Sequence, residues 1–186
     1  YSPAPRIFTQ LRDADAIFFI GVEFEKSLQP RLKKIFGRKN ADKILYDVRQ
    51  GMKFRQMEAF SSKKQVANDP HVWLDPENMI VYAKQLEKFL AEKDPANQEF
   101  YQNNFENYAA ELKELKQKIE NELAEYRGAK VIVVHPAFGY FFDICGIEQL
   151  AIEKGGREPG ARHLKELLET AEKEKVKIIF TQPQFS

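Results

Sequence analysis

A helical repeat in the middle of this 186-residue chain constrains its fold more than any other feature. Between residues 101 and 126, apolar or aromatic side chains recur with a mean spacing of about 3.6, which is the period of an α-helix. The repeat consists of Tyr101, Phe105, Tyr108, Leu112, Leu115, Ile119, Leu123 and Tyr126. A helix over residues 95–127 would be about 50 Å long. One small lobe cannot cover that length, so we expect a strut between two lobes.

Short apolar runs alternate with helical segments on both sides of this repeat. The runs predicted as strands are residues 16–21, 44–48, 130–135, 149–152 and 176–181. Strands that alternate with helices are typical of parallel sheets. The predicted fold is therefore α/β, with two lobes of parallel sheets flanked by helices and joined by one long backbone helix. We expect residues 1–93 to form the N-terminal lobe, 94–127 the linking helix and 128–186 the C-terminal lobe.

Two prolines predict opposite effects on neighbouring helices. Asp75 is a natural N-cap, and Pro76 and Glu77 suit the first turn of a helix that should reach about residue 93. Pro30 lies inside a second predicted helix, residues 23–36, and should kink or split it because proline lacks the N–H that a helix interior uses.

Composition excludes several classes of protein. The 29 Lys and Arg residues balance 28 Asp and Glu residues, which argues against a protein built mainly to bind nucleic acid or anionic lipid. The single cysteine, Cys145, excludes an internal disulfide and a cysteine metal cluster, and we expect it to be a small buried hydrophobe. The last predicted strand has no helix after it, so we expect both lobes to be incomplete and the polypeptide to extend beyond both ends.

Two of the three histidines occupy informative places. His135 follows four β-branched residues and should lie at the carboxyl end of a parallel strand, where open α/β folds bind ligands. His71 precedes the Asp75-capped helix. If the two rings converge, their imidazoles suit a borderline cation such as zinc, although either could instead be a hydrogen-bonded packing residue. His163 lies in the first turns of a charged helix, where we expect a solvated side chain.

Five segments of the chain resemble, in order, the zinc and manganese solute-binding proteins of ABC importers. Residues 69–78, DPHVWLDPEN, are similar to the second metal-histidine motif of that family. Residues 135–141, HPAFGYF, are similar to the third motif in its zinc-type version. Residues 1–5, 158–164 and 182–185 resemble further family segments. The match covers nearly the whole chain.

The resemblance implies two α/β lobes with a metal ion held in the cleft between them. His71 and His135 would be metal ligands from opposite lobes, and an acceptor on the second nitrogen of each ring should orient it. The family's first histidine and fourth ligand fall before Tyr1 and after Ser186. Residues 52–70 also lack the histidine-rich loop of many zinc-type members, so His135 carries most of the preference for zinc over manganese.

The resemblance also implies a capture protein rather than an enzyme. It would bind Zn²⁺ in the periplasm, or outside the cell at the membrane, act as a monomer and pass the metal to the permease of an ABC importer. Manganese or iron binding by the same family is the nearest alternative. A zinc-dependent hydrolase would need a general base beside an open coordination position, and no His-Glu-x-x-His motif is present. A surface adhesin is a third alternative.

Overall fold

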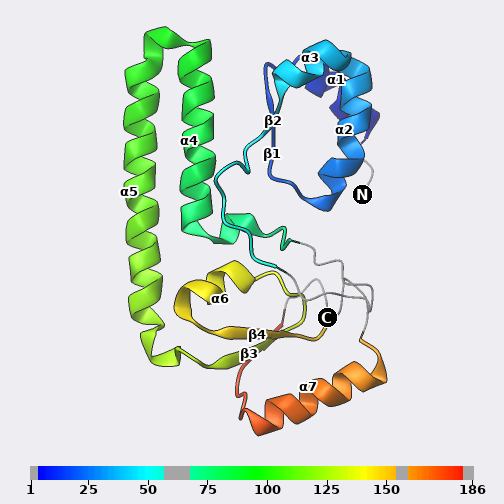
Figure 1. The fold of residues 1–186 in the computed structure, drawn as a ribbon, viewed down its shortest axis with the longest axis vertical. Helices are drawn as coiled ribbons and strands as arrows, with labels where there is room; N and C mark the ends of the chain where they lie inside the picture. Colours follow the sequence, from blue (N-terminus) through cyan, green and yellow to red (C-terminus); the bar gives the residue numbers. More distant parts are fainter. Residues whose placement is uncertain (1–3, 57–67, 154–158, 182–186) are drawn as a thin grey trace. The chain divides into compact units, whose positions relative to one another are not determined.

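The computed structural model describes residues 4–56, 68–153 and 159–181. The chain divides into two compact units, coloured along the sequence in Figure 1. The first unit comprises Tyr1–Lys53 with Glu77–Ala109, and the second comprises Phe54–Pro76 with Ala110–Ser186. The lobe expected from the sequence spans residues 1–93; of these, the described residues 54–56 and 68–76 group with the second unit. Within the described residues, no helix has the length and apolar character needed to cross a membrane.

The first unit contains a small parallel sheet. Its elements are α1 (Pro5–Arg12), β1 (Ile17–Phe19), α2 (Glu23–Phe36), α3 (Arg38–Ile44), β2 (Leu45–Asp47) and α4 (Pro76–Lys93). Strand β1 pairs with β2 in parallel, so the first two predicted strands are confirmed at shorter length. Helix α4 begins at Pro76, as predicted. Helix α2 runs through Pro30 as a single element, so the predicted split does not occur.

Helix α4 packs on this sheet through aromatic rings. Phe89 meets Phe18 of β1 with ring centroids 5.3 Å apart, and it meets Tyr46 of β2 at 4.9 Å. Both contacts are edge-on, which is a favoured geometry for aromatic pairs. At the start of α2, the buried Glu25 carboxylate accepts the backbone N–H groups of Gly21 and Val22, which supplies acceptors near a helix end that has spare donors.

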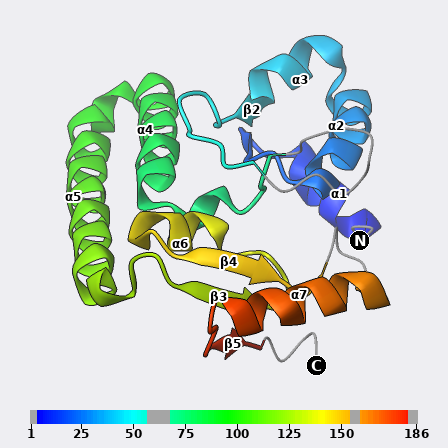
Figure 2. The same cartoon turned by 60° about the horizontal axis from the view of Figure 1, so that its bottom comes forward.

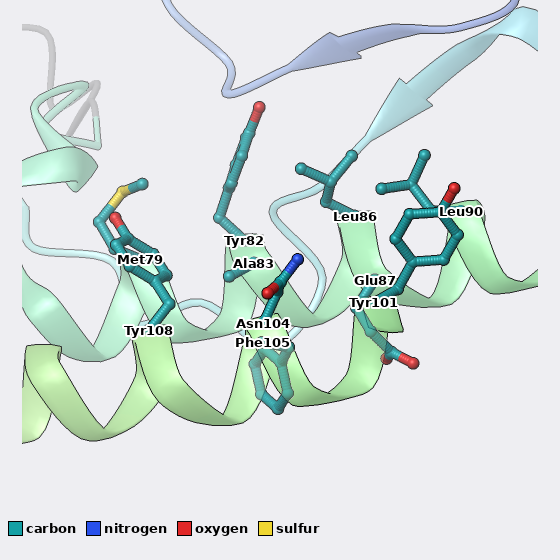
Figure 3. A pocket seen from close by; sticks show the side chains of 10 residues that line it. All are labelled: Met79, Tyr82, Ala83, Leu86, Glu87, Leu90, Tyr101, Asn104, Phe105 and Tyr108. Atoms are coloured by element: carbon teal, nitrogen blue, oxygen red, sulfur yellow. The ribbon is translucent and has the colours of Figure 1, made fainter. Parts of the chain in front are cut away.

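The predicted long helix is present as α5 (Gln98–Glu122), between the 3₁₀ turns η2 (Pro95–Asn97) and η3 (Ala124–Tyr126). Its 25 residues span about 37 Å at 1.5 Å per residue. Within the first unit, a groove of about 360 Å³ lies between α4 and α5. Figure 3 shows the side chains that line it, which include Tyr82, Tyr101, Phe105 and Tyr108.

The second unit holds a parallel sheet of three strands in the order β4-β3-β5. Its elements, besides the 3₁₀ turn η1 (Val72–Leu74), are β3 (Lys130–Val133), α6 (Gly139–Cys145), β4 (Glu148–Ala151), α7 (Ala161–Lys173) and β5 (Ile179–Phe180). Helix α6 lies on one side of the sheet and α7 on the other (Figure 1, Figure 2). The predicted α/β class, with parallel sheets flanked by helices, is confirmed.

The core of the second unit forms where α6 covers the central strand. Its buried residues are Val131, Val133, Phe142, Cys145 and Ile147, and Ile119 and Leu123 of the α5 region pack against them. Cys145 is 1% exposed, as expected of a small hydrophobe, and burial raises the pKa of its thiol. This core fixes both ends of α6 and the end of β3, which carry the residues discussed next.

Candidate metal centre

The structure brings His71 and His135 together. Their ring centroids are 5.4 Å apart and their planes are inclined by 77°. His71 is the residue before η1, and His135 lies two residues beyond β3. Both histidines belong to the second unit, whereas the sequence led us to expect one from each lobe.

A buried carboxylate orients His71. Its Nδ1 lies 2.7 Å from Oδ1 of Asp69, and its backbone N–H donates to the same oxygen at 3.0 Å. The Asp69 side chain is fully buried, and the His71 side chain is only 13% exposed. A carboxylate accepts from an N–H, so the proton of neutral His71 belongs on Nδ1 and the lone pair belongs on Nε2.

The same arrangement recurs at His135 with a different acid. The His135 Nδ1 lies 2.7 Å from Oε2 of Glu153, which again assigns the lone pair to Nε2. Glu153 reaches this position because the backbone pairing of β3 and β4 continues past the strands. Ile152 donates to the carbonyl of Val133 at 2.8 Å, and Glu153 donates to that of Val134 at 2.9 Å. The expected acceptor on the second nitrogen is thus present at both rings.

Hydrogen bonds tie the segment of His71 to the segment of His135. The hydroxyl of Tyr140, in α6, donates to the carbonyl of Asp69 at 3.0 Å and accepts the backbone N–H of Arg55 at 3.0 Å. The Arg55 carbonyl accepts the N–H of Asp69 at 2.8 Å. Burial raises the pKa of the Tyr140 hydroxyl, so it stays a donor at neutral pH.

The third histidine has another role. The Nε2 of His163 lies 3.0 Å from the carbonyl oxygen of Ala151, which links α7 to the end of β4. The ring is half-buried, not solvated as its charged neighbours suggested. In the described part of the chain, no three His, Cys, Asp or Glu side chains form a group that could hold a metal ion.

Sequence reasoning gave no role at this centre to three residues: Arg55, Asp69 and Glu153. The sequence contained a signal for Glu153, because this residue follows the predicted strand 149–152. The carboxyl ends of parallel strands lie at the same edge of a sheet, so Glu153 should lie on the same edge as His135. Asp69 was noticed only as part of a motif. No local pattern marks Arg55, whose partners Tyr140 and Asp143 lie 85 and 88 positions along the chain.

Known proteins resemble the whole chain. A family model described as ZnuA, the periplasmic component A of the zinc-uptake complex, matches residues 1–186. The metal ABC transporter substrate-binding lipoprotein SloC of Streptococcus mutans is 31% identical over 98% of this chain and 61% of its own length. The manganese ABC transporter substrate-binding lipoprotein PsaA of Streptococcus mitis is 32% identical, with coverages of 98% and 60%.

Solved structures share the fold. A crystal structure of ZnuA superposes with a TM-score of 0.85 at 36% identity and covers 100% of this chain and 69% of that one. The AdcAII protein of Streptococcus pneumoniae gives 0.80 at 26% identity, with coverages of 100% and 68%. The chain spans about three fifths of the length of the curated relatives it matches. It belongs to the ZnuA family, described as the periplasmic component A of zinc-uptake complexes.

Proposed function

We propose that this chain is the part of a solute-binding protein that captures a divalent transition metal outside the cytoplasmic membrane for delivery to an ABC permease. Membership of the ZnuA family supports this function, as do relatives named as metal, manganese and iron substrate-binding lipoproteins of ABC transporters. One observation in the structure carries the proposal. His71 and His135 face each other, and each holds a carboxylate on Nδ1.

The spacing of the two rings suits one tetrahedral ion. With Zn–N distances of about 2.0–2.1 Å and a tetrahedral angle at the metal, two imidazole centroids lie roughly 5.2 Å apart. The rings of His71 and His135 are 5.4 Å apart. A closed tetrahedral site needs four ligands. We propose that the other two come from outside the part of the chain that the structure describes.

Zinc is the metal that we propose for this chain. Imidazole suits zinc, whereas manganese favours sites rich in oxygen. Solved relatives include a ZnuA deletion mutant with zinc bound and Zn(II)-bound AdcAII variants, while PsaA is named for manganese and MtsA of Streptococcus pyogenes for iron. The two imidazoles of this chain favour zinc, the metal bound in the ZnuA and AdcAII structures.

Metal analysis of the full-length protein tests the capture function directly. Protein purified without added metal should contain about one zinc ion per chain, measured by elemental analysis. Zinc titration against a chromophoric chelator should give one saturable site. Protein that neither retains nor binds zinc, manganese or iron would contradict capture. Sustained hydrolysis of ester or peptide substrates that His135→Ala abolishes would favour an enzyme instead.

A cobalt spectrum separates zinc from manganese as the intended cargo. Most nitrogen and oxygen sites bind zinc more tightly than manganese, so affinity alone does not discriminate. Coordination geometry does, and Co²⁺ reports it in visible light. Four-coordinate Co²⁺ with strong visible bands would support zinc. The weak bands of a five- or six-coordinate ion would contradict zinc and favour the manganese alternative.

A further inference from the structure

The Arg55 side chain contacts both segments that carry the candidate metal ligands. On the side of His71, its Nη1 lies 3.5 Å from Oδ2 of Asp69. On the side of His135, its Nε donates to Oδ2 of Asp143, in α6, at 2.9 Å. The side chain is 27% exposed, so the guanidinium is largely enclosed by these groups.

Asp69 needs such a cation. Its side chain is fully buried, and both bonds from His71 end on Oδ1. The other oxygen, Oδ2, has no hydrogen-bond partner among the described residues, so its 3.5 Å contact with Arg55 is an ion pair. A buried carboxylate is costly unless a charge of opposite sign faces it. Removing the guanidinium would therefore leave Asp69 poorly compensated while it still holds the His71 ring.

Gly139 makes room for the guanidinium at the start of α6. A Cβ placed on Gly139 would lie 2.5 Å from Nη1 and 2.6 Å from Cζ of Arg55, well inside the contact distance of real atoms. Any larger residue would push the guanidinium away. Gly139 belongs to the same short segment as His135, so the position of Arg55 is fixed against the segment that carries the second histidine.

The backbone frame around Arg55 is held separately from its side chain. The Arg55 N–H and carbonyl bond to Tyr140 and Asp69, and the Tyr140 hydroxyl also bonds to Asp69. None of these bonds uses the guanidinium. Its loss should therefore disturb the aim of the Asp69 carboxylate and the His71 ring more than it disturbs the local fold.

We propose that Arg55 is a positioning residue of the metal centre, which sets the relative orientation of the His71 and His135 rings through Asp69 and the start of α6. This inference rests on the proposed metal-capture function. Arg55 touches no metal and acts through the groups that hold the ligands. Groups bonded directly to metal ligands, such as Asp69, typically contribute 10- to 100-fold to metal affinity, and Arg55 acts through such a group.

Arg49 supplies a matched control from the first unit. Its side chain lies against Gly21 and donates from Nε to Asp47 at 2.8 Å, with 34% of the side chain exposed. It thus repeats the arrangement of an arginine laid over a glycine and paired with an aspartate. Arg49→Gln removes such a pair where no metal ligand is attached to it.

The experiment compares Arg55→Gln, Gly139→Ala and Arg49→Gln in the full-length protein. Zinc affinity is measured by chelator competition, the visible Co²⁺ spectrum reports ligand geometry, and thermal melting of the metal-free protein reports stability. We expect Arg55→Gln to weaken zinc binding by about 10-fold, the lower end of the range for groups bonded directly to ligands, and to alter the Co²⁺ bands. Gly139→Ala displaces the guanidinium and keeps its charge. It should also weaken zinc binding and alter the Co²⁺ bands. Arg49→Gln should change zinc affinity by less than about twofold.

Two results would overturn the proposal. One is an unchanged zinc affinity and Co²⁺ spectrum in Arg55→Gln, even if its melting temperature falls as much as that of Arg49→Gln. If Arg55→Gln does not fold, the other is a Gly139→Ala protein that folds and binds both metals as the wild type does. A wild-type protein that binds no metal would instead refute the proposed function itself.

Discussion

The pair His71–His135 and the isolated His163 are built from the same residue type, yet their surroundings differ in one respect. Each ring of the pair has a carboxylate on Nδ1, whereas His163 has a backbone carbonyl on Nε2. In the pair, the Nδ1 contact therefore assigns the lone pair to Nε2, the nitrogen farther from the backbone. In His163 that nitrogen is committed to Ala151. The partner of each ring, more than the presence of a histidine, separates a candidate ligand from a structural residue.

Alanine substitution of each histidine should give the largest difference between the pair and His163. We expect His71→Ala or His135→Ala to weaken zinc binding by more than about 100-fold, beyond the usual effect of outer partners, because each removes a donor nitrogen. His163→Ala should leave zinc affinity within about twofold and lower the free energy of unfolding by about 1 kcal/mol, the usual value of one hydrogen bond. Chelator competition and denaturant melts measure the two quantities. An equal loss of affinity in all three variants would refute the distinction.

Proton competition gives the next largest effect. Imidazole binds metal only when it is neutral, and free histidine side chains protonate near pH 6.5. Zinc binding should therefore weaken progressively between pH 7.5 and pH 5.5, since both ligands must lose any bound proton. The number of protons that compete with each zinc ion should fall by one in His135→Ala. It should stay unchanged in His163→Ala. An affinity that is flat over this range would show that histidines are not the ligands.

The carboxylates that orient the pair should matter less than the rings themselves. We expect Asp69→Asn and Glu153→Gln to weaken zinc binding by about 10- to 100-fold, since an amide keeps the shape but loses the charge. Asp69→Asn should have the larger effect because Asp69 is fully buried, whereas Glu153 is 16% exposed. Glu148→Gln is the control, since Glu148 pairs with Lys130 in the same sheet. A loss as large in Glu148→Gln would mean that the effect is one of stability.

The smallest expected effect is a change in Trp73 fluorescence when zinc binds to the pair. It is the single tryptophan of the chain, and its ring lies 5.4 Å from that of His71. Zinc binding should therefore produce a modest, saturable change in tryptophan fluorescence. His71→Ala should remove the change, and His163→Ala should retain it. A fluorescence that is constant through a zinc titration known to saturate the site would contradict a metal position beside His71.

The sequence predicted the parts of this molecule that depend on local pattern. The spacing from Tyr101 to Tyr126 located α5, and the β-branched run before His135 located β3. It could not show that α2 continues through Pro30, because tertiary packing can outweigh the local cost of a proline. It also could not show that His71 groups with the second unit, since no local pattern reveals which distant neighbours a residue packs against.

The candidate centre also has parts that the sequence predicted and parts that it could not predict. Family motifs pointed to His71 and His135, and a general rule for metal sites predicted an acceptor on each second nitrogen. The identity of those acceptors depends on contacts far apart in sequence. Glu153 reaches His135 only through the register of β3 with β4. Arg55 pairs with Asp143, which lies 88 positions farther along the chain.

The bridge between Gln56 and Asn68 has a consequence for changes in chain length. Gln56 and Asn68 form an antiparallel bridge, and Asp69 donates to the carbonyl of Arg55 just beside it. These bonds fix the backbone immediately before His71. The entropy of closing a loop grows slowly with its length, by about 0.6 kcal/mol for each doubling. A sensor or tag inserted between Gln56 and Asn68 should therefore leave the bridge formed and the register of His71 unchanged.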